Sequence, residues 1–225
     1  MEPTRYNQKL EFILRTAARI FAAKGYHPTS MRDIARETGV SLAGLYYYCK
    51  SKDELLFLIQ ERCFGRVLGR LTERLQETSG PVEKLHVFIE NHLSFFAANM
   101  AEMKVLSHEA DSLTGQLYGR VAATKQDYTH LARSILAEIQ AALPNDRRAI
   151  DVTIATYALF GMMNWIYNWY DPRGKLDVTA LVENLTRLFL SGFTGGNILE
   201  EQSFAALPRT EPFSVWRGVA PPLES

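Results

Sequence analysis

Residues 41–52 read SLAGLYYYCKSK, a stretch in which three consecutive tyrosines stand between a glycine and two lysines. Consecutive residues of a helix point in different directions, so a single core cannot bury all three rings. At least one of these tyrosines must therefore face outward. The function of this end of the chain depends on the partner that the exposed ring contacts.

The segments on either side of the tyrosines have the proportions of a helix-turn-helix. Apolar residues at helical spacing predict a first helix over residues 7–24, which ends at Gly25. A second, short helix follows the N-cap candidates Thr29 and Ser30 and closes at Gly39. The turn TGVS connects it to a third helix, LAGLYYYC, which contains the tyrosines.

In a helix-turn-helix, the second of the two short helices enters the major groove of DNA. The small side chains of Ala43 and Gly44 would let the backbone approach a duplex, and Leu42 can meet a thymine methyl group. Lys50 and Lys52 place positive charge nearby. The residue types in this stretch therefore suit contact with a nucleic acid.

The distribution of charge also favours a polyanionic partner for the N-terminal part. Residues 1–52 contain nine Lys/Arg and four Asp/Glu, a net charge of +5, whereas the remainder of the chain has a net charge of −5. Basic surfaces attract polyanions. We expect a small basic domain that meets DNA and an acidic body that has a different task.

The rest of the chain keeps a helical period, and no segment shows the alternation of a strand. A long helix is expected from Lys52 to the break at SGP, followed by helices over residues 81–98 and 101–111. Helical spacing then continues from SLTGQ to QAAL, residues 112–143, and further helices are expected over residues 147–170 and 178–193. The predicted fold class is all-α. It comprises a three-helix helix-turn-helix domain over residues 1–52, a larger helical domain over residues 53–193 and an extended C-terminal tail over residues 194–225.

The sequence contains none of the short motifs that mark common enzymes or metal sites. There is no phosphate-binding glycine loop, GxSxG elbow, HExxH motif or Cys or His pair at metal spacing, so we expect no catalysis, cofactor or metal. The chain has no long uncharged apolar run and no signal-peptide pattern, which predicts a cytoplasmic protein without a membrane partner. Cys49 and Cys63 are expected to be reduced thiols.

The segment TSMRDIARETGVSLAGLYYYCKSKDELL, with FAAKGYHPTS before it, resembles the DNA-binding domain of the TetR family of bacterial repressors. The resemblance covers roughly residues 7–60 and implies operator DNA as a partner. It places Arg32, Leu42, Ala43, Tyr46 and Tyr47 at base or groove positions, Thr29, Tyr48 and Lys52 at phosphate positions, and Ser41 at the helix N-cap. The chain departs from the family at Cys49, usually Phe, and at Gly44, often Thr or Ser.

The middle helices are rich in large, soft side chains, which are typical both of an adaptable cavity and of an ordinary core. This region and the last two helices resemble the TetR regulators of fatty-acid, sterol-ring and related acyl catabolism, which implies a small hydrophobic effector such as an acyl-CoA. Arg120, Lys125 and Arg133 are candidate basic groups for its phosphates. The predicted ligand-contacting residues are Phe64, Val67, Leu68, His92, Phe96, Met100, Met103, Arg120, Tyr128, Phe160, Met163 and Asn164.

The segments IDVTIATYALFGMMNWIYNWY and VTALVENLTRLFLSGF are apolar over too much of their circumference for solvent-facing helices of a monomer. One recognition helix reads only half of a symmetric site, so a homodimer on a palindromic operator is expected. The sequence thus predicts a repressor that an apolar effector releases from DNA. Two alternatives stay open: a TetR-like regulator of efflux or stress genes with another hydrophobic ligand, and a helical adaptor without DNA binding.

Overall fold

The computed structural model describes residues 4–109, 112–144 and 150–194, and every regular element in these ranges is a helix, which confirms the all-α prediction. None of the described helices is both long and apolar enough to cross a lipid bilayer. The α-helices are α1 (Arg5–Lys24), α2 (Met31–Thr38), α3 (Leu42–Tyr48), α4 (Lys52–Gln76), α5 (Pro81–Ala98), α6 (Met100–His108), α7 (Gly115–Ala142), α8 (Val152–Asn164) and α9 (Val178–Phe193), and a 3-10 helix covers Trp165–Asn168.

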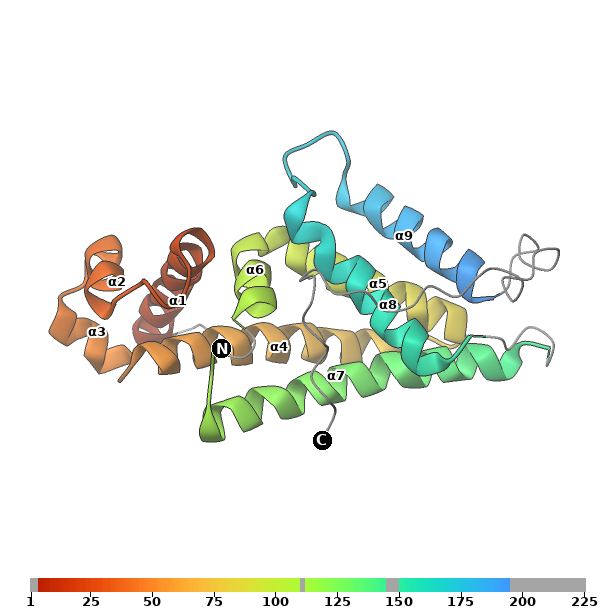
Figure 1. Ribbon diagram of the computed structural model, residues 1–225, viewed down its shortest axis with the longest axis horizontal. Helices are drawn as coiled ribbons and strands as arrows, with labels where there is room; N and C mark the ends of the chain where they lie inside the picture. The colour runs from red at the N-terminus through yellow and green to blue at the C-terminus, as the bar shows by residue number, and fades with distance from the viewer. Residues whose placement is uncertain (1–3, 110–111, 145–149, 195–225) are drawn as a thin grey trace, which may run out of the picture.

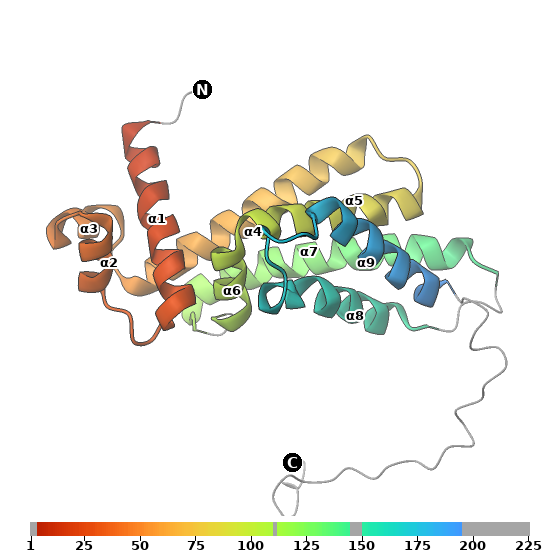
Figure 2. The ribbon, with the colours of Figure 1, turned by 90° about the horizontal axis from the view of Figure 1, so that it is seen from above.

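The helices form a small head and a longer body (Figure 1). Helices α1, α2 and α3 make the head, with Ile34 and Leu45 fully buried in its core. Helix α4 starts in the head and continues along the body, where it contacts α5 and α7. Helix α9 lies against α5 and α8 at the far side of the body, and α6 lies next to α1 (Figure 2).

Two of the expected helices are shorter in the structure. The segment expected to be helical to residue 170 forms α8 and then tightens into the 3-10 helix at Trp165, a common ending for a helix before a break such as DPRG. Helix α6 ends at His108, where Glu109 is its C-cap, and not at residue 111. Residues 145–149 and the expected tail beyond residue 194 lie outside the described residues.

The buried side chain of Tyr26 joins the head to the body. Its hydroxyl donates to the carboxylate of Asp53 in the first turn of α4, and its backbone N–H donates to Oε1 of Glu109 at 3.2 Å. Burial and the bond with Asp53 raise the pKa of the Tyr26 hydroxyl above its usual value. The ammonium of Lys52 donates to the carbonyls of Tyr26 and His27 at 2.9 and 3.1 Å. The loop after α1 is thereby fixed to the start of α4.

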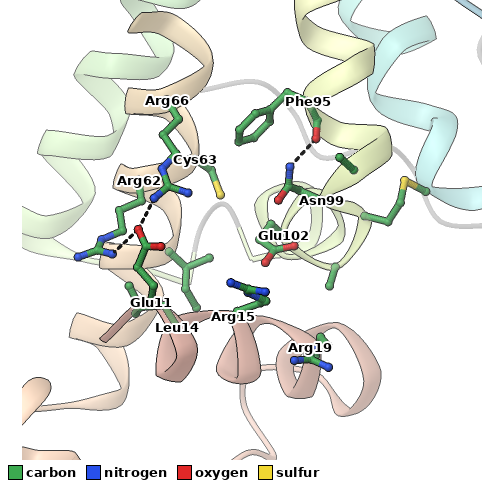
Figure 3. A pocket seen from close by; sticks show the side chains of 14 residues that line it. Glu11, Leu14, Arg15, Arg19, Arg62, Cys63, Arg66, Phe95, Asn99 and Glu102 are labelled. Carbon is green, nitrogen blue, oxygen red and sulfur yellow. Dashed lines mark hydrogen bonds and ion pairs between the residues drawn. The ribbon is translucent and has the colours of Figure 1, made fainter. Parts of the chain in front are cut away.

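Ion pairs connect the head to the body at a second place. Glu11 on α1 pairs with Arg62, at 3.4 Å, and with Arg66, both of which lie on α4 (Figure 3). These charged groups are partly exposed, so the pairs contribute little to stability. They mark the face of α1 that is turned toward α4.

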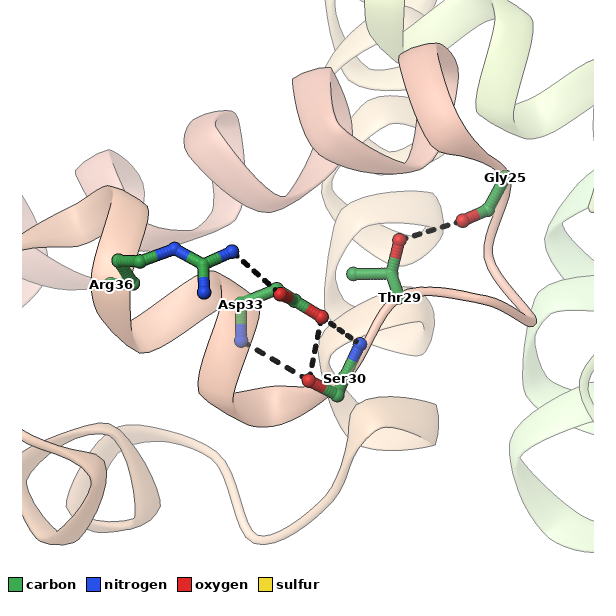
Figure 4. Close-up of polar contacts among 5 residues, drawn as sticks. All are labelled: Gly25, Thr29, Ser30, Asp33 and Arg36. Atoms are coloured by element: carbon green, nitrogen blue, oxygen red, sulfur yellow. Dashed lines mark hydrogen bonds and ion pairs between the residues drawn. The ribbon is translucent and has the colours of Figure 1, made fainter.

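A capping box starts α2 (Figure 4). The hydroxyl of Ser30 accepts from the N–H of Asp33 at 3.2 Å, and the Asp33 carboxylate accepts from the N–H of Ser30 at 3.0 Å. Asp33 also pairs with Arg36 at 2.7 Å. The hydrogen bonds from Ser30, followed by the bond from Arg36, lower the pKa of Asp33 to about 2. Ser30, and not Thr29, is therefore the N-cap of α2.

Substitution of Ser30 by alanine should lower the free energy of unfolding by about 1 kcal/mol, because α2 loses its N-cap. Folding lowers the pKa of Asp33 from its ordinary 3.8 to about 2. The ionised carboxylate therefore adds to the free energy of unfolding above pH 3.8, and this contribution is lost as the pH falls through about 2. Urea unfolding at pH 7 and fixed protein concentration measures the change. Ser134→Ala, in the exposed middle of α7, is the matched control, and an equal loss in both variants would contradict the capping account.

Candidate functional site

The three tyrosines of α3 point in different directions, as expected. Tyr46 and Tyr47 are 47% and 73% exposed, whereas Tyr48 is half-buried. The ring of Tyr48 stacks on Tyr6 of α1 with 5.0 Å between centroids, and the Tyr47 ring meets the same Tyr6 edge-on at 5.9 Å. Leu45, on the opposite face of α3, is fully buried. Two of the three rings are thus presented to an external partner, and Tyr6 supports the outermost one.

The N-terminal turns of α1 extend this surface. A shallow groove runs beside the α3 rings, and Arg5 and Lys9 bring positive charge to it. These α1 residues were absent from the predicted DNA contacts. Their basic character was visible in the sequence, but which face of α1 meets α3 depends on packing. The residues that line the groove are Arg5, Tyr6, Gln8, Lys9, Phe12, Tyr47 and Tyr48.

The start of α3 explains the glycine at position 44. The hydroxyl of Ser41, the N-cap, accepts from the Gly44 N–H at 3.0 Å. A Cβ atom on Gly44 would lie 2.9 Å from Cγ1 of Val40 and 3.0 Å from Oγ of Ser41, so a larger residue would disturb the cap. Leu42 is half-buried and Ala43 is exposed at the same end. This end of α3 is therefore held closely by the turn before it.

The remaining predicted DNA contacts differ in exposure. Arg32 is exposed near the start of α2. Thr29 is 2% exposed, and its hydroxyl donates to the carbonyl of Gly25 at 2.7 Å. Two of the three N–H donors of Lys52 are used by backbone carbonyls. The polar groups of Thr29 and Lys52 thus hold the head together, and their phosphate contacts stay predictions.

A cavity of about 480 Å³ lies in the body among α4, α5, α6, α7 and α8. Seven of the twelve predicted ligand residues line it: Phe64, His92, Phe96, Met103, Tyr128, Phe160 and Asn164. Lys125, a candidate basic group for the effector's phosphates, also lines it. The remaining lining residues are not among the predicted ligand contacts, and they are Leu106, Ser107, Thr129, Tyr157, Gly161, Trp165 and Tyr167. The cavity volume falls within the range of small-molecule sites.

The structure does not bring the other five predicted residues to this cavity. They are Val67, Leu68, Met100, Arg120 and Met163. Met100 lines a different cavity, beside α1. Arg120 is exposed, pairs with Glu61 and lies over the ring of Phe57 at 4.6 Å. Val67 and Met163 are buried in the core, so their apolar character marked burial and not a cavity wall.

His92 is the most distinctive group in the cavity wall. Its side chain is buried, and Nδ1 lies 3.2 Å from the hydroxyl of Tyr128. Burial lowers the pKa of His92 to about 3, so the ring is neutral at pH 7. The side chain of Asn164 acts in the opposite direction, since its hydrogen-bonding interaction with the imidazole raises the pKa by a smaller amount. Within the part of the chain that the structure describes, Nε2 of His92 has no hydrogen-bond partner. An unpaired buried nitrogen is costly, and a polar atom of a ligand would satisfy it.

The side chains around His92 are aromatic. Phe96 and Phe160 lie 4.7 and 6.3 Å from the imidazole, measured between ring centroids. Lys125 brings positive charge to the same cavity, with its Nζ 5.5 Å from the centre of the Phe64 ring. The cavity therefore combines an apolar wall, one buried polar nitrogen and one ammonium group.

Several large apolar side chains are exposed on α8, the 3-10 helix and α9. Ile154 and Tyr157 on α8 are 66% and 64% exposed, Trp165 in the 3-10 helix is 61% exposed, and Leu188 on α9 is 66% exposed. Leu159 is buried within the subunit. Large apolar side chains that stay exposed in this way can mark protein contacts where they lie together.

Comparison with known proteins gives two family matches. Residues 13–59 match the family described as "Bacterial regulatory proteins, tetR family". Residues 78–193 match the family described as "Tetracyclin repressor-like, C-terminal domain". The two matches cover the helix-turn-helix and most of the body.

Individual relatives cover most of the chain. A fatty acid metabolism regulator protein of Bacillus subtilis is 27% identical over 184 residues, 80% of this chain and 93% of the relative. AibR, whose crystal structure is in complex with isovaleryl coenzyme A and operator DNA, is 28% identical in sequence to this chain. The two structures align with a TM-score of 0.71 over 80% of this chain and 97% of AibR. The ketosteroid transcriptional regulator KstR2 of Mycobacterium tuberculosis shares the fold, with a TM-score of 0.75 over 87% of this chain and 97% of that one. The two sequences are 20% identical.

Replacement of Tyr47 by alanine should weaken binding to an operator duplex by about 1–3 kcal/mol and binding to random DNA much less, because the exposed ring is predicted to contact bases. Tyr47→Phe removes only the hydroxyl, so it distinguishes the contribution of the hydroxyl from that of the ring, which also packs on Tyr6. Fluorescence anisotropy with both duplexes measures the losses. Tyr118→Ala on α7 is the control, and equal losses on both duplexes for Tyr47→Ala would make Tyr47 a backbone contact.

Proposed function

Because the chain belongs to the TetR family of bacterial transcriptional regulators, we propose that it is a repressor that binds a palindromic operator as a homodimer and is released by an acyl-CoA. Relatives of the chain are regulators, and we propose that it has no catalytic activity. The observation that carries the effector proposal is the cavity in which the buried Nε2 of His92 has no hydrogen-bond partner among the described residues.

The head supplies the operator contact in this proposal. Tyr46 and Tyr47 face outward from α3, and Arg32 is exposed near the start of α2. Base edges are read by side chains of the recognition helix, while basic groups of neighbouring elements bind phosphates. We assign the phosphate role of α1 to Arg5 and Lys9, beside the groove.

The cavity in the body supplies the effector site. Its aromatic wall suits an apolar acyl group, and His92 suits a polar atom such as a thioester carbonyl, to which a neutral imidazole can donate from Nε2. Lys125 suits an anionic group of the same ligand. Two relatives support this ligand class by their names: the fatty acid metabolism regulator, and AibR, whose structure contains isovaleryl coenzyme A.

The exposed apolar patch on α8, the 3-10 helix and α9 is the proposed dimer interface. A twofold axis through it would let the same patch of each subunit cover that of its partner. Tyr157 and Trp165 belong both to this patch and to the effector cavity wall. Dimer contact and effector binding would therefore share side chains.

The effector proposal predicts that long-chain or ring-bearing acyl-CoA thioesters lower operator affinity about 5- to 150-fold, the range of ordinary allosteric coupling. Free CoA should act weakly, because it lacks the apolar part. Operator fragments selected from random duplexes would be titrated with thioesters, free acids and CoA. A response only to other hydrophobic compounds would instead favour a regulator of efflux or stress genes, and would leave the repressor function intact.

Substitution of His92 by phenylalanine should reduce the affinity for the active thioester about 2- to 10-fold, because one hydrogen bond is lost while the ring volume is nearly kept. His130→Phe, on the exposed side of α7, is the matched control. Isothermal titration calorimetry of both variants measures the effect. Unchanged affinity in His92→Phe would remove His92 from the effector contacts.

Leu188→Glu should give a folded monomer with little operator affinity, because the charge would be buried in the proposed interface. Leu188 is 66% exposed in the subunit, so the fold itself should tolerate the change. Tyr118→Glu, at an exposed site on α7, is the control. Sedimentation equilibrium gives the mass of each variant, and a Leu188→Glu protein that stays dimeric would move the interface elsewhere.

A further inference from the structure

A second cavity, of about 370 Å³, lies where α1 of the head meets α4, α5 and α6 of the body (Figure 3). It is not part of the effector cavity, although its volume also falls within the range of small-molecule sites. Four arginines line it from two sides: Arg15 and Arg19 lie on α1, and Arg62 and Arg66 lie on α4.

Positive charge exceeds negative charge in this second cavity. Two of its lining residues, Glu11 and Glu102, are acidic. Glu11 pairs with arginines of α4, and no ion pair of the described residues involves Arg15 or Arg19. Both α1 arginines are exposed, so a ligand can reach them from solvent.

The start of α6 adds to the attraction for an anion. The side chain of its N-cap, Asn99, donates to the carbonyl of Phe95 at 2.6 Å and does not cap the helix. Met100 and Ala101, in the first turn, line the second cavity. The first turn of a helix carries uncapped N–H groups and the positive end of the helix dipole. Glu102, in the same first turn, opposes this effect, so the four arginines supply most of the attraction for a negative charge in this space.

We propose that the second cavity binds a phosphorylated small molecule, with its phosphate oxygens held between the arginines of α1 and those of α4. The planar guanidinium group matches phosphate oxygens in pairs of hydrogen bonds. Leu14, Ile59 and Phe95 form an apolar part of the wall, which suits a nonpolar or aromatic portion of the ligand. Nucleotides and coenzyme A are two sources of this chemistry.

Such a ligand would join the head to the body, and this regulatory consequence rests on the proposed function. Helices α4 and α5 form walls of both cavities. On α4, Cys63 lines the second cavity and Phe64 the effector cavity, and on α5, Phe95 lines the second cavity and Phe96 the effector cavity. A phosphate held between α1 and α4 would restrain the angle of the head, and a ligand in the effector cavity would press on the other side of the same helices.

Isothermal titration calorimetry of the protein with pyrophosphate, ADP and CoA, in phosphate-free buffer, tests the site without DNA. We expect the double variant Arg15→Gln/Arg19→Gln to lose at least tenfold in affinity for every compound that binds the wild type. Arg70→Gln/Lys175→Gln removes the same charge at exposed positions outside both cavities and should bind as the wild type does. His92→Phe should leave pyrophosphate binding unchanged, because it alters only the effector cavity.

Binding of pyrophosphate alone would identify the phosphate as the recognised group, and binding of ADP or CoA in addition would identify the source. The proposal is overturned if none of the three compounds binds at millimolar concentration, or if both double variants lose affinity equally. Operator affinity is measured separately on the same variants. A protein that binds pyrophosphate but no operator would disprove the repressor proposal and leave the phosphate site standing.

Discussion

The position of the head depends on Tyr26, a buried side chain at the junction of three elements. Its hydroxyl is bound by the first turn of α4, its N–H is bound by Glu109 at the end of α6, and its carbonyl accepts from Lys52. Gln60, further along α4, donates to the backbone carbonyl of the same Glu109 at 3.1 Å. The loop after α1, the start of α4 and the end of α6 are therefore joined by hydrogen bonds, and a rotation of the head relative to α6 would have to break or rearrange them.

This constraint explains how a ligand in the body would reach DNA. Helix α4 is continuous from Lys52 to Gln76, and Phe64 on it lines the effector cavity. A ligand that prefers one tilt of α4 shifts the population of head positions only by its difference in affinity for the two states. In the proposed dimer, a change of tilt alters the spacing of two recognition helices. Operator affinity is sensitive to that spacing, because both half-sites must be met at once.

The sequence predicted the helices better than the cavity, for physical reasons. Helix periodicity and caps are local properties, so Pro81–Ala98 and Val178–Phe193 were predicted with the observed limits. A cavity depends on how helices from distant segments face one another. Met100 and Met103 are equally apolar, yet packing places one beside the arginines and the other beside His92. The role of Tyr6 under the exposed rings was unpredictable for the same reason.

The central claim is that effector binding changes the distance between the two heads of a dimer. Glu37→Cys offers an exposed label site on α2, while Cys49 and Cys63 are buried and their burial raises each thiol pKa to about 12, which leaves them unreactive. Pulsed electron paramagnetic resonance between the two labels should show a shifted distance distribution when the active thioester is added. A distribution that stays unchanged while operator affinity falls would contradict the account.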